Sequence, residues 1–411
     1  MDASDTAMIS SDNTTETQGM GRSVVLPALL LFGAMFNLTL VVAGLKEFII
    51  EDLGGTIADA TLFFSVETLA YILFAPLWGL LSDRFGLRKP LVAIGFAGSA
   101  LIYLIYGKLH SIPLLLAFRF VQGAFSVLGW STVMAMMLDH PVYGRKGRFM
   151  GLMGASLIFG VAIGAPMGGY LTRWFGARAP LLAAAISFGL LGCLSLFLRE
   201  SPTLTRQLRV REILAALRSK PRVFLPFSFH FVDRLAVGLF VVVFPLYIDS
   251  LGATDPAQRG RYLALFLLPF AFLQYFSGRL AERIGAGGPL VIGSLLYGLA
   301  LCGLGFSDLS SLTVMMVALG VFAALMFPPA ILLVSQWSDP KTRASAMGGF
   351  NLAGSMGFAL GPILGGWAYT TRGFAFAFVL CGVFEIALAI VGALLLIRWA
   401  SQARATRSAS S

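Results

Sequence analysis

Charged residues are scarce in this 411-residue chain. Asp, Glu, Lys and Arg make up 12% of it, against about 25% in a typical soluble domain, and 57% of the residues are hydrophobic. A soluble chain of this composition would expose large apolar patches that promote aggregation. The composition therefore excludes an ordinary soluble protein and indicates a chain that crosses a membrane many times.

Cysteine is also rare, with three residues in the whole chain. Cys193, Cys302 and Cys381 lie far apart, each within an apolar run, and show neither zinc-ligand spacing nor a disulfide framework. We interpret them as small apolar packing residues. The cysteines therefore identify no metal site.

Motifs of ATP-driven pumps and of several enzyme classes are absent from the sequence. It has no phosphate-binding loop of the form G-x-x-x-x-G-K-[ST], no haem motif and no nucleophile elbow. The loops on one side of the membrane are too short to hold an enzyme domain. We therefore expect a protein that is not an enzyme and has no cofactor, with a proton gradient as its energy source.

Long apolar runs dominate what is present. A membrane-spanning helix needs about 20 mostly apolar residues, and runs this long and uniform do not fit the strands of a barrel. The sequence predicts an all-α integral membrane protein with twelve transmembrane helices. Their expected limits are 24–46, 58–81, 90–107, 112–138, 148–172, 179–198, 223–249, 260–282, 289–306, 309–335, 344–370 and 374–398.

The basic residues are distributed unevenly between the two sides of the membrane. If the N-terminus is cytoplasmic, the cytoplasmic segments hold 21 Lys and Arg residues and the outer segments hold 7. The positive-inside rule then places both termini in the cytoplasm, in a bacterial inner membrane or one derived from it. The net charge of +10 is explained by this orientation, so no nucleic-acid partner is expected. Residues 1–22 lack the pattern of a secretory signal and are expected to form a disordered tail.

The chain repeats itself at an offset of about 200 residues. The segment "GLLSDRFGLRKPLV" (79–92) aligns with "GRLAERIGAGGPLV" (278–291), and "GVAIGAPMGGY" (160–170) aligns with "GFALGPILGGW" (357–367). Two parallel six-helix repeats follow, with substrate sites expected near the midplane between them. The expected divisions are a tail at 1–22, an N-terminal bundle at 23–198, a cytoplasmic linker at 199–222, a C-terminal bundle at 223–398 and a tail at 399–411.

These motifs resemble those of the major facilitator superfamily. The loop between the second and third apolar runs is similar to the family signature G-x-L-x-D-R-x-G-R-K, and the fourth run contains R-x-x-Q-G as Arg119, Gln122 and Gly123. The resemblance covers nearly the whole chain. It implies the twelve-helix fold of that family and transport by alternating access, with motifs most similar to those of drug:proton antiporter-like members.

Glycine-proline patterns in the fifth and eleventh runs strengthen the likeness. Glycines four residues apart let helices approach closely in lipid, and proline permits bending. The fifth-run pattern looks like the antiporter signature, although its proline stands one place late. The residues are Gly160, Gly164, Pro166, Gly168 and Gly169, and in the second copy Gly361, Pro362, Gly365 and Gly366.

The signature loop is expected to act as a cytoplasmic latch between the halves. The resemblance implies that Asp83 pairs with the arginines of this loop and lies near the start of span eleven, and that Asp139 joins the network. The members of this gating motif are Gly79, Asp83, Arg84, Gly86, Arg88, Lys89 and Asp139. The second copy keeps Gly278, Glu282 and Arg283 but has Gly287 and Gly288 in place of the final basic pair, so its latch should be weaker.

Ionisable residues deep in a span are costly and indicate function. Glu67 lies near the midplane in span two and is the first candidate for a proton site, with Asp233 in span seven the second. Arg119 is implied by the family motif to assist proton coupling, and His230 lies one turn from Asp233. Because adjacent helical residues point about 100° apart, we expect that Asp233 and Arg234 do not simply neutralise one another. Glu385 in span twelve is expected to be peripheral.

Polar side chains beside these charges are candidates for lining the transport cavity. They are Asn37, Gln122, Arg234, Gln274 and Tyr275. The sequence favours a proton-coupled secondary transporter that exports a small amphipathic or apolar solute and acts as a monomer in the lipid bilayer. Uptake by proton symport, iron transport using Glu67, His230 and Asp233, and a non-transporting sensor or scaffold remain alternatives.

Overall fold

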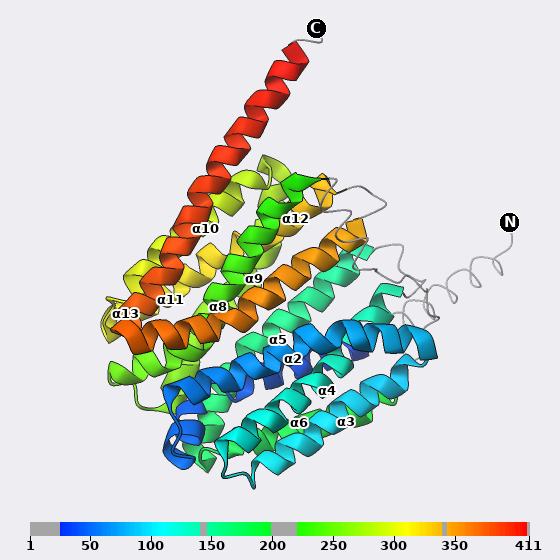
Figure 1. Cartoon of the computed structure of the whole chain (residues 1–411), viewed down its shortest axis with the longest axis vertical. Coiled ribbons are helices and arrows are strands. Elements are labelled where there is room, and N and C mark those ends of the chain that lie inside the picture. Colours follow the sequence, from blue (N-terminus) through cyan, green and yellow to red (C-terminus); the bar gives the residue numbers. More distant parts are fainter. Residues whose placement is uncertain (1–24, 140–145, 199–219, 339–342, 409–411) are drawn as a thin grey trace, which may run out of the picture.

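The computed structural model describes residues 25–139, 146–198, 220–338 and 343–408, and helices account for nearly all of them (Figure 1). The described helices begin with Val25–Leu40 and the π-helix η1 (Lys46–Asp52). The others are α2 (Ile57–Phe85), α3 (Arg88–Tyr106), α4 (Ile112–Asp139), α5 (Lys146–Phe175), α6 (Ala179–Ser195), η2 (Pro221–Val223), α8 (Phe224–Ser250), α9 (Pro256–Ile284), α10 (Gly287–Leu304), α11 (Leu309–Ala324), α12 (Phe327–Trp337) and α13 (Arg343–Ser408).

The twelve predicted spans correspond to these helices. In the described part of the chain, nine helical stretches are long and apolar enough to cross a membrane, and Val25–Leu40 and Ala179–Ser195 are shorter apolar helices. One of the nine, Ala346–Gln402, contains two spans, because the backbone breaks at Gly373. Gly373 has φ 83°, a conformation that favours glycine, and α13 bends sharply in Figure 1. The all-α multi-pass membrane fold is thus confirmed.

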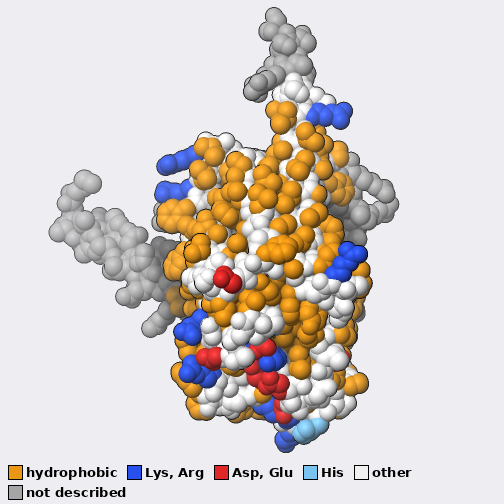
Figure 2. Space-filling model, turned by 90° about the vertical axis from the view of Figure 1, so that its left-hand side faces the viewer, with side chains coloured by type: hydrophobic (Ala, Val, Ile, Leu, Met, Phe, Trp, Pro, Cys, Tyr) orange, Lys and Arg blue, Asp and Glu red, His pale blue; other side chains and the backbone are white. Residues whose placement is uncertain are grey.

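The surface agrees with a membrane setting. Figure 2 shows one face covered by hydrophobic side chains over most of its height, with most acidic side chains toward the lower end and basic side chains toward both ends. Large apolar side chains such as Leu101, Leu182 and Leu394 are more than half exposed. In a bilayer these side chains contact lipid, so their exposure carries no penalty.

A stripe of glycines on α5 brings the N-terminal helix close. A side chain at Gly160, Gly164 or Gly168 would collide with backbone carbonyls of that helix. These carbonyls belong to Phe32, Phe36 and Leu40. Small residues at this spacing permit close helix packing in lipid, as the sequence predicted.

The second half repeats this contact. A side chain at Gly357 or Gly361 on α13 would collide with backbone of α8, and one at Gly365 would meet the side chains of Leu239 and Val243. The internal repeat detected in the sequence therefore has a structural counterpart, since the fifth and eleventh spans pack in the same way on the first and seventh.

The helices before residue 199 meet those after residue 220 along two seams. One seam joins α5 to α9, and the other joins α2 to the first part of α13. Glycines mark both seams, because a Cβ on Gly260 would lie 2.7 Å from the carbonyl oxygen of Ala165 and one on Gly366 would lie 2.9 Å from Thr61 Oγ1. The two seams hold the repeats against each other.

Candidate functional site

A buried ion pair joins α2 to α4 in the first half. Arg119 Nη2 lies 2.5 Å from Glu67 Oε2, and the two side chains are 0% and 1% exposed. Gly123, one turn after Arg119, lets the helices meet at this point, since its Cβ would lie 2.8 Å from the carbonyl oxygen of Glu67. The fourth-span motif therefore supplies both the cation and the close approach that Glu67 needs.

The guanidinium of Arg119 is fixed by four further contacts. Its Nη1 donates to the hydroxyl of Tyr103 at 2.8 Å and to Oε1 of Gln122 at 2.9 Å, and its Nε donates to the carbonyl of Phe63 at 3.2 Å. The same group lies 4.2 Å from the centre of the Phe63 ring. A cation held over an aromatic face and by several acceptors is well satisfied, so Arg119 acts as a fixed positive charge beside Glu67.

The second oxygen of Glu67 points to a different group. The hydroxyl of Tyr71 donates to Glu67 Oε1 at 2.9 Å and lies 3.3 Å from Ser126 Oγ. Tyr71 is partly exposed, and its ring packs against Trp130 with the ring centres 5.9 Å apart. The carboxylate thus has an ion-paired side and a side connected through hydroxyl groups to a partly exposed tyrosine.

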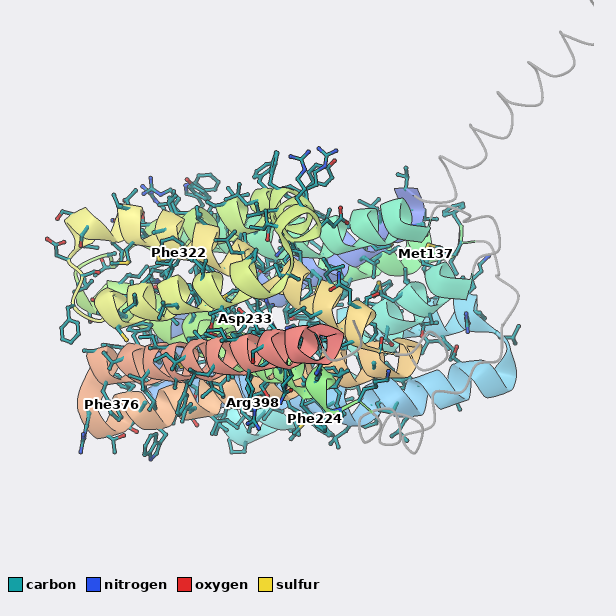
Figure 3. All side chains as sticks on the ribbon, turned by 90° about the horizontal axis from the view of Figure 1, so that it is seen from above. Met137, Phe224, Asp233, Phe322, Phe376 and Arg398 are labelled. Carbon is teal, nitrogen blue, oxygen red and sulfur yellow. The ribbon has the colours of Figure 1, made fainter. Side chains whose placement is uncertain are left out.

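The second half holds another charge pair, formed by a buried aspartate and a partly exposed arginine, and the sequence interpretation of this pair was wrong. Arg234 donates from Nε to Asp233 Oδ2 at 2.9 Å, and its Nη2 lies 2.7 Å from the same oxygen. A 100° separation on the helix does not prevent pairing, because the long arginine side chain can turn back to its neighbour. Arg234 also lies 5.5 Å from the Phe327 ring centre. Figure 3 shows Asp233 within the packed helices beside α13.

In the part of the chain that the structure describes, no hydrogen bond or ion pair joins His230 to either pair, although Arg234 lies close enough to act on it electrostatically. Its ring stacks on Phe350 with centres 4.0 Å apart and lies against Gly354 of α13. Among the described residues, no three His, Cys, Asp or Glu side chains are placed to hold a metal ion. The structure therefore does not support the metal alternative built on Glu67, His230 and Asp233.

The other predicted cavity residues are scattered. Asn37 is buried and donates to Ser187 Oγ at 3.0 Å, and Gln122 belongs to the Arg119 cluster. Gln274 is partly buried, while Tyr275 is 64% exposed and lies beneath the guanidinium of Arg279. Only Gln122 among them is brought to the first candidate site, and Arg234 belongs to the second.

Much of the predicted cytoplasmic latch lies outside the described side chains. This holds for Asp83, Arg84 and Asp139. Gly86 ends α2 with φ 64°, Arg88 is 2% exposed and Lys89 is partly buried. In the second copy, Glu282 and Arg283 are exposed. The latch between the halves stays a prediction.

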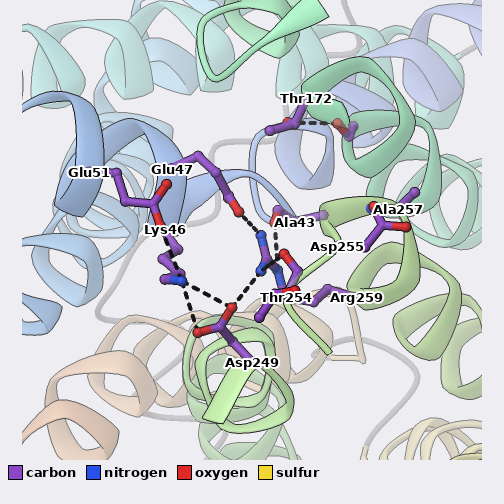
Figure 4. Close-up of polar contacts among 11 residues, drawn as sticks. Ala43, Lys46, Glu47, Glu51, Thr172, Asp249, Thr254, Asp255, Ala257 and Arg259 are labelled. Atoms are coloured by element: carbon purple, nitrogen blue, oxygen red, sulfur yellow. Dashed lines mark hydrogen bonds and ion pairs between the residues drawn. The ribbon is translucent and has the colours of Figure 1, made fainter. Parts of the chain in front are cut away.

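A charge cluster at the opposite end was missed from the sequence. We call it the η1-end network: Lys46, Glu47, Glu51, Asp249 and Arg259 (Figure 4). Arg259 is 0% exposed, pairs with Glu47, and places Nη1 2.9 Å from Asp249 Oδ1. It also donates to the backbone carbonyls of Ala43 and Thr254.

Lys46 extends this network. Its Nζ lies 3.0 Å from Asp249 Oδ2 and 3.1 Å from Glu51 Oε1. Burial lowers the pKa of Lys46, but the hydrogen bonds and charges of Asp249 and Glu51 outweigh it and hold that pKa above its usual 10.5. The network ties the first half to the second, and its signal in the sequence is a pair of charges at the facing ends of two consecutive spans, Asp249 and Arg259.

Comparison with known proteins defines the class of this fold and then its family. A family model described as Major Facilitator Superfamily matches residues 28–257 and 226–411. A structure titled as a bacterial homolog of the human lysosomal transporter Spinster, inward-facing and unoccupied, has a TM-score of 0.76 at 15% identity and covers 92% of this chain and 98% of its own. The architecture is that of a multi-pass membrane transporter. The chain belongs to the Major Facilitator Superfamily.

Two relatives in sequence agree with this assignment. A tetracycline resistance protein, class G, of Vibrio anguillarum is 28% identical over 284 residues, covering 66% of this chain and 67% of the relative. The synaptic vesicular amine transporter of Rattus norvegicus is 23% identical over 347 residues, covering 82% and 67%. The predicted likeness to drug:proton antiporter-like members is confirmed by the tetracycline resistance relatives.

Proposed function

We propose that this protein is a proton-coupled secondary transporter that exports a small amphipathic or apolar solute by alternating access. The observation that carries the proposal is the buried carboxylate of Glu67, held between the fixed cation Arg119 and the partly exposed Tyr71. A carboxylate at this depth is costly unless it is paired, and such groups mark proton pathways in transporters.

The geometry suggests how a proton could be coupled to movement. In the described conformation, Glu67 is ionised because Arg119 and Tyr71 both donate to it. A proton arriving through the Tyr71 side would remove the attraction between Glu67 and Arg119 and loosen the contact of α2 with α4. Since α2 also forms a seam with α13 of the other half, protonation at Glu67 would bias the seam between the halves.

The substrate class rests on the relatives and on the two aromatic rings near Glu67. Tetracycline resistance proteins and vesicular amine transporters are among the proteins that this chain resembles. The partly exposed rings of Tyr71 and Trp130 beside a carboxylate would suit an amphipathic or cationic solute. We infer a monomer in the bacterial inner membrane with cytoplasmic termini, driven by the proton gradient without a cofactor.

The test is transport by protein reconstituted in vesicles with an imposed pH gradient. We expect uphill movement of an amphipathic amine or tetracycline with counterflow of protons, and loss of at least tenfold in Glu67→Gln. Exchange of labelled for unlabelled substrate at equal pH needs no net proton movement, so the variant should retain it and thereby show that it folds.

Two results would contradict the proposal. Absence of proton flux with every solute tested would exclude proton coupling, and unchanged uphill transport in Glu67→Gln would remove Glu67 as the proton site. Proton and solute moving in the same direction would indicate symport in place of export.

A further inference from the structure

A third buried carboxylate, Glu385, lies outside the two charge pairs. It is on the last part of α13, is 0% exposed, and faces α10, where Ser294 Oγ donates to its Oε2 at 2.5 Å. Gly298 of α10 makes this approach possible, because a Cβ there would lie 3.0 Å from Glu385 Cβ and 2.8 Å from the carbonyl oxygen of Gly382. The carboxyl group is therefore built into the contact between two helices and does not face lipid, and its expected position outside the central cavity stays a prediction.

The surroundings of Glu385 differ from those of Glu67. Glu67 receives a guanidinium and a phenol, whereas the hydrogen bond given to Glu385 comes from a neutral hydroxyl. Its Oε1 has no hydrogen-bond partner among the described residues. An ionised carboxylate can accept about four hydrogen bonds and is costly to bury without them.

The neighbouring charges do not supply the missing partner. From α8, Asp233 and Arg234 interact electrostatically with Glu385, but Arg234 is already paired with Asp233. From α10 come the neutral Ser294 and Tyr297, and from α13 itself the buried thiol of Cys381. Two carboxylates share one guanidinium, so the cluster carries one uncompensated negative charge unless a proton is bound.

We propose that Glu385 is a second proton-binding group of the carrier, loaded with a proton in the described conformation while Glu67 is ionised. The inference rests on the proposed proton coupling only for its role in transport, and not for the protonation itself. A protonated Glu385 accepts the hydrogen bond of Ser294 at Oε2 and gains an O–H donor at Oε1. Buried acceptors without a partner among the described residues stand in the same cluster, on Asp233 and Tyr297.

Binding and release at this site would change how many protons move for each solute. When the halves rearrange, Arg234 could move from Asp233 toward Glu385, which would then release its proton. With exchange at both Glu67 and Glu385, two protons move in each cycle, whereas Glu385→Gln leaves one. Glutamine copies the shape and neutrality of the protonated acid, so this variant should fold.

Infrared difference spectroscopy of the reconstituted protein tests the protonation directly. We expect a band of a buried protonated carboxyl group at neutral pH in the wild type. The band should remain in Glu67→Gln and be lost in Glu385→Gln. Absence of the band in the wild type, or its persistence in Glu385→Gln, would overturn the proposal.

The coupling ratio tests the role in transport. At a fixed pH gradient, the logarithm of the limiting solute gradient should fall about twofold in Glu385→Gln, since it scales with the number of coupled protons. An unchanged ratio with a lost infrared band would show a structural proton and overturn the transport role. If proton coupling fails altogether, the infrared result still stands by itself, so the two failures are distinguishable.

Discussion

The two ends of the bundle differ in how tightly their helices are enclosed. On α2, most side chains from Ala60 to Ala70 toward the η1 end are buried, whereas from Tyr71 to Ser82 toward the other end Ser82 is the only buried side chain among the described residues. α9 shows the same gradient: its early residues pack against the first half, and Phe276 near its far end is 63% exposed. The halves are therefore closed together at the η1 end.

The charge and glycine contacts follow the same division. At the η1 end, Arg259 joins both halves, and the glycines Gly169 and Gly260 touch backbone across the α5–α9 seam. At the far end, a Cβ added to Gly79 or Gly154 would meet none of the described atoms within 4 Å. The difference indicates a carrier closed at one end and more open at the other, which is one of the two states that alternating access requires.

Of the substitutions considered, Arg259→Gln should have the largest effect on closure of the η1 end. Arg259→Gln leaves Glu47 and Asp249 facing each other at the seam, and breaking a buried ion pair costs about 3–5 kcal/mol. We expect the η1 end to open, with a shift of at least about 100-fold in the equilibrium between the states. The measurement is labelling of Thr61→Cys, in a background without native cysteines, by a membrane-impermeant maleimide.

The reporter is well placed for this purpose. Thr61 is 3% exposed and packs against Gly366 at the α2–α13 seam, so its labelling reports separation of the halves. The matched control is Arg261→Gln, because Arg261 is exposed two residues along the same helix. Equal labelling of the reporter in Arg259→Gln and Arg261→Gln would show that the η1-end network does not hold this end closed.

Disrupting the glycine contacts at the α5–α9 seam should open the η1 end less than the loss of Arg259 does. A Cβ on Gly169 would collide with the carbonyl oxygen of Pro256, so Gly169→Val should force α5 from α9 at a cost of about 1–3 kcal/mol. Labelling of Thr61→Cys should rise, and solute exchange should fall several-fold. Gly154→Val, at the open end of the same helix, is the control and should stay within about twofold of wild type. A larger loss of solute exchange in Gly154→Val than in Gly169→Val would contradict the view that the η1 end is the more tightly packed one.

The sequence was sufficient for the parts of this structure that depend on local pattern. Hydropathy gave the spans, and glycine spacing gave the close contacts of α5 and α13 with their partner helices, because both follow from helix geometry in lipid. Arg119 and Glu67 are 52 residues apart in the sequence. Their pairing could not be predicted from local pattern, because it depends on the packing of α4 on α2. Arg259 and Glu47 are 212 residues apart in the sequence, and they meet only because the two halves are in contact at the η1 end.

Helix geometry alone led to a wrong prediction for a pair that includes a long side chain. Asp233 and Arg234 pair although their Cβ directions diverge, since the guanidinium lies several bonds from the backbone. The position of Glu385 depended on Gly298 and Ser294 of α10, which nothing in the spacing of α13 reveals. The buried polar network is thus set by contacts between helices, while the helices themselves are set by the chain.

Lys46 should contribute least to closure of the η1 end, and its contribution has a defined pH dependence. Its side chain is 26% exposed, and pairs of this kind give about 0–1 kcal/mol, so Lys46→Gln should raise Thr61→Cys labelling by no more than about fivefold. Because the pKa of Lys46 lies above its usual 10.5, the stabilisation is present at neutral pH and is lost as the pH rises through the folded-state value. Wild-type labelling, corrected for maleimide reactivity with an exposed reporter cysteine, should therefore stay flat from about pH 6 to about pH 9 and rise only at higher pH. The Lys46→Gln variant should show no such rise, and a rise that survives the substitution would assign the pH dependence to another group at this end.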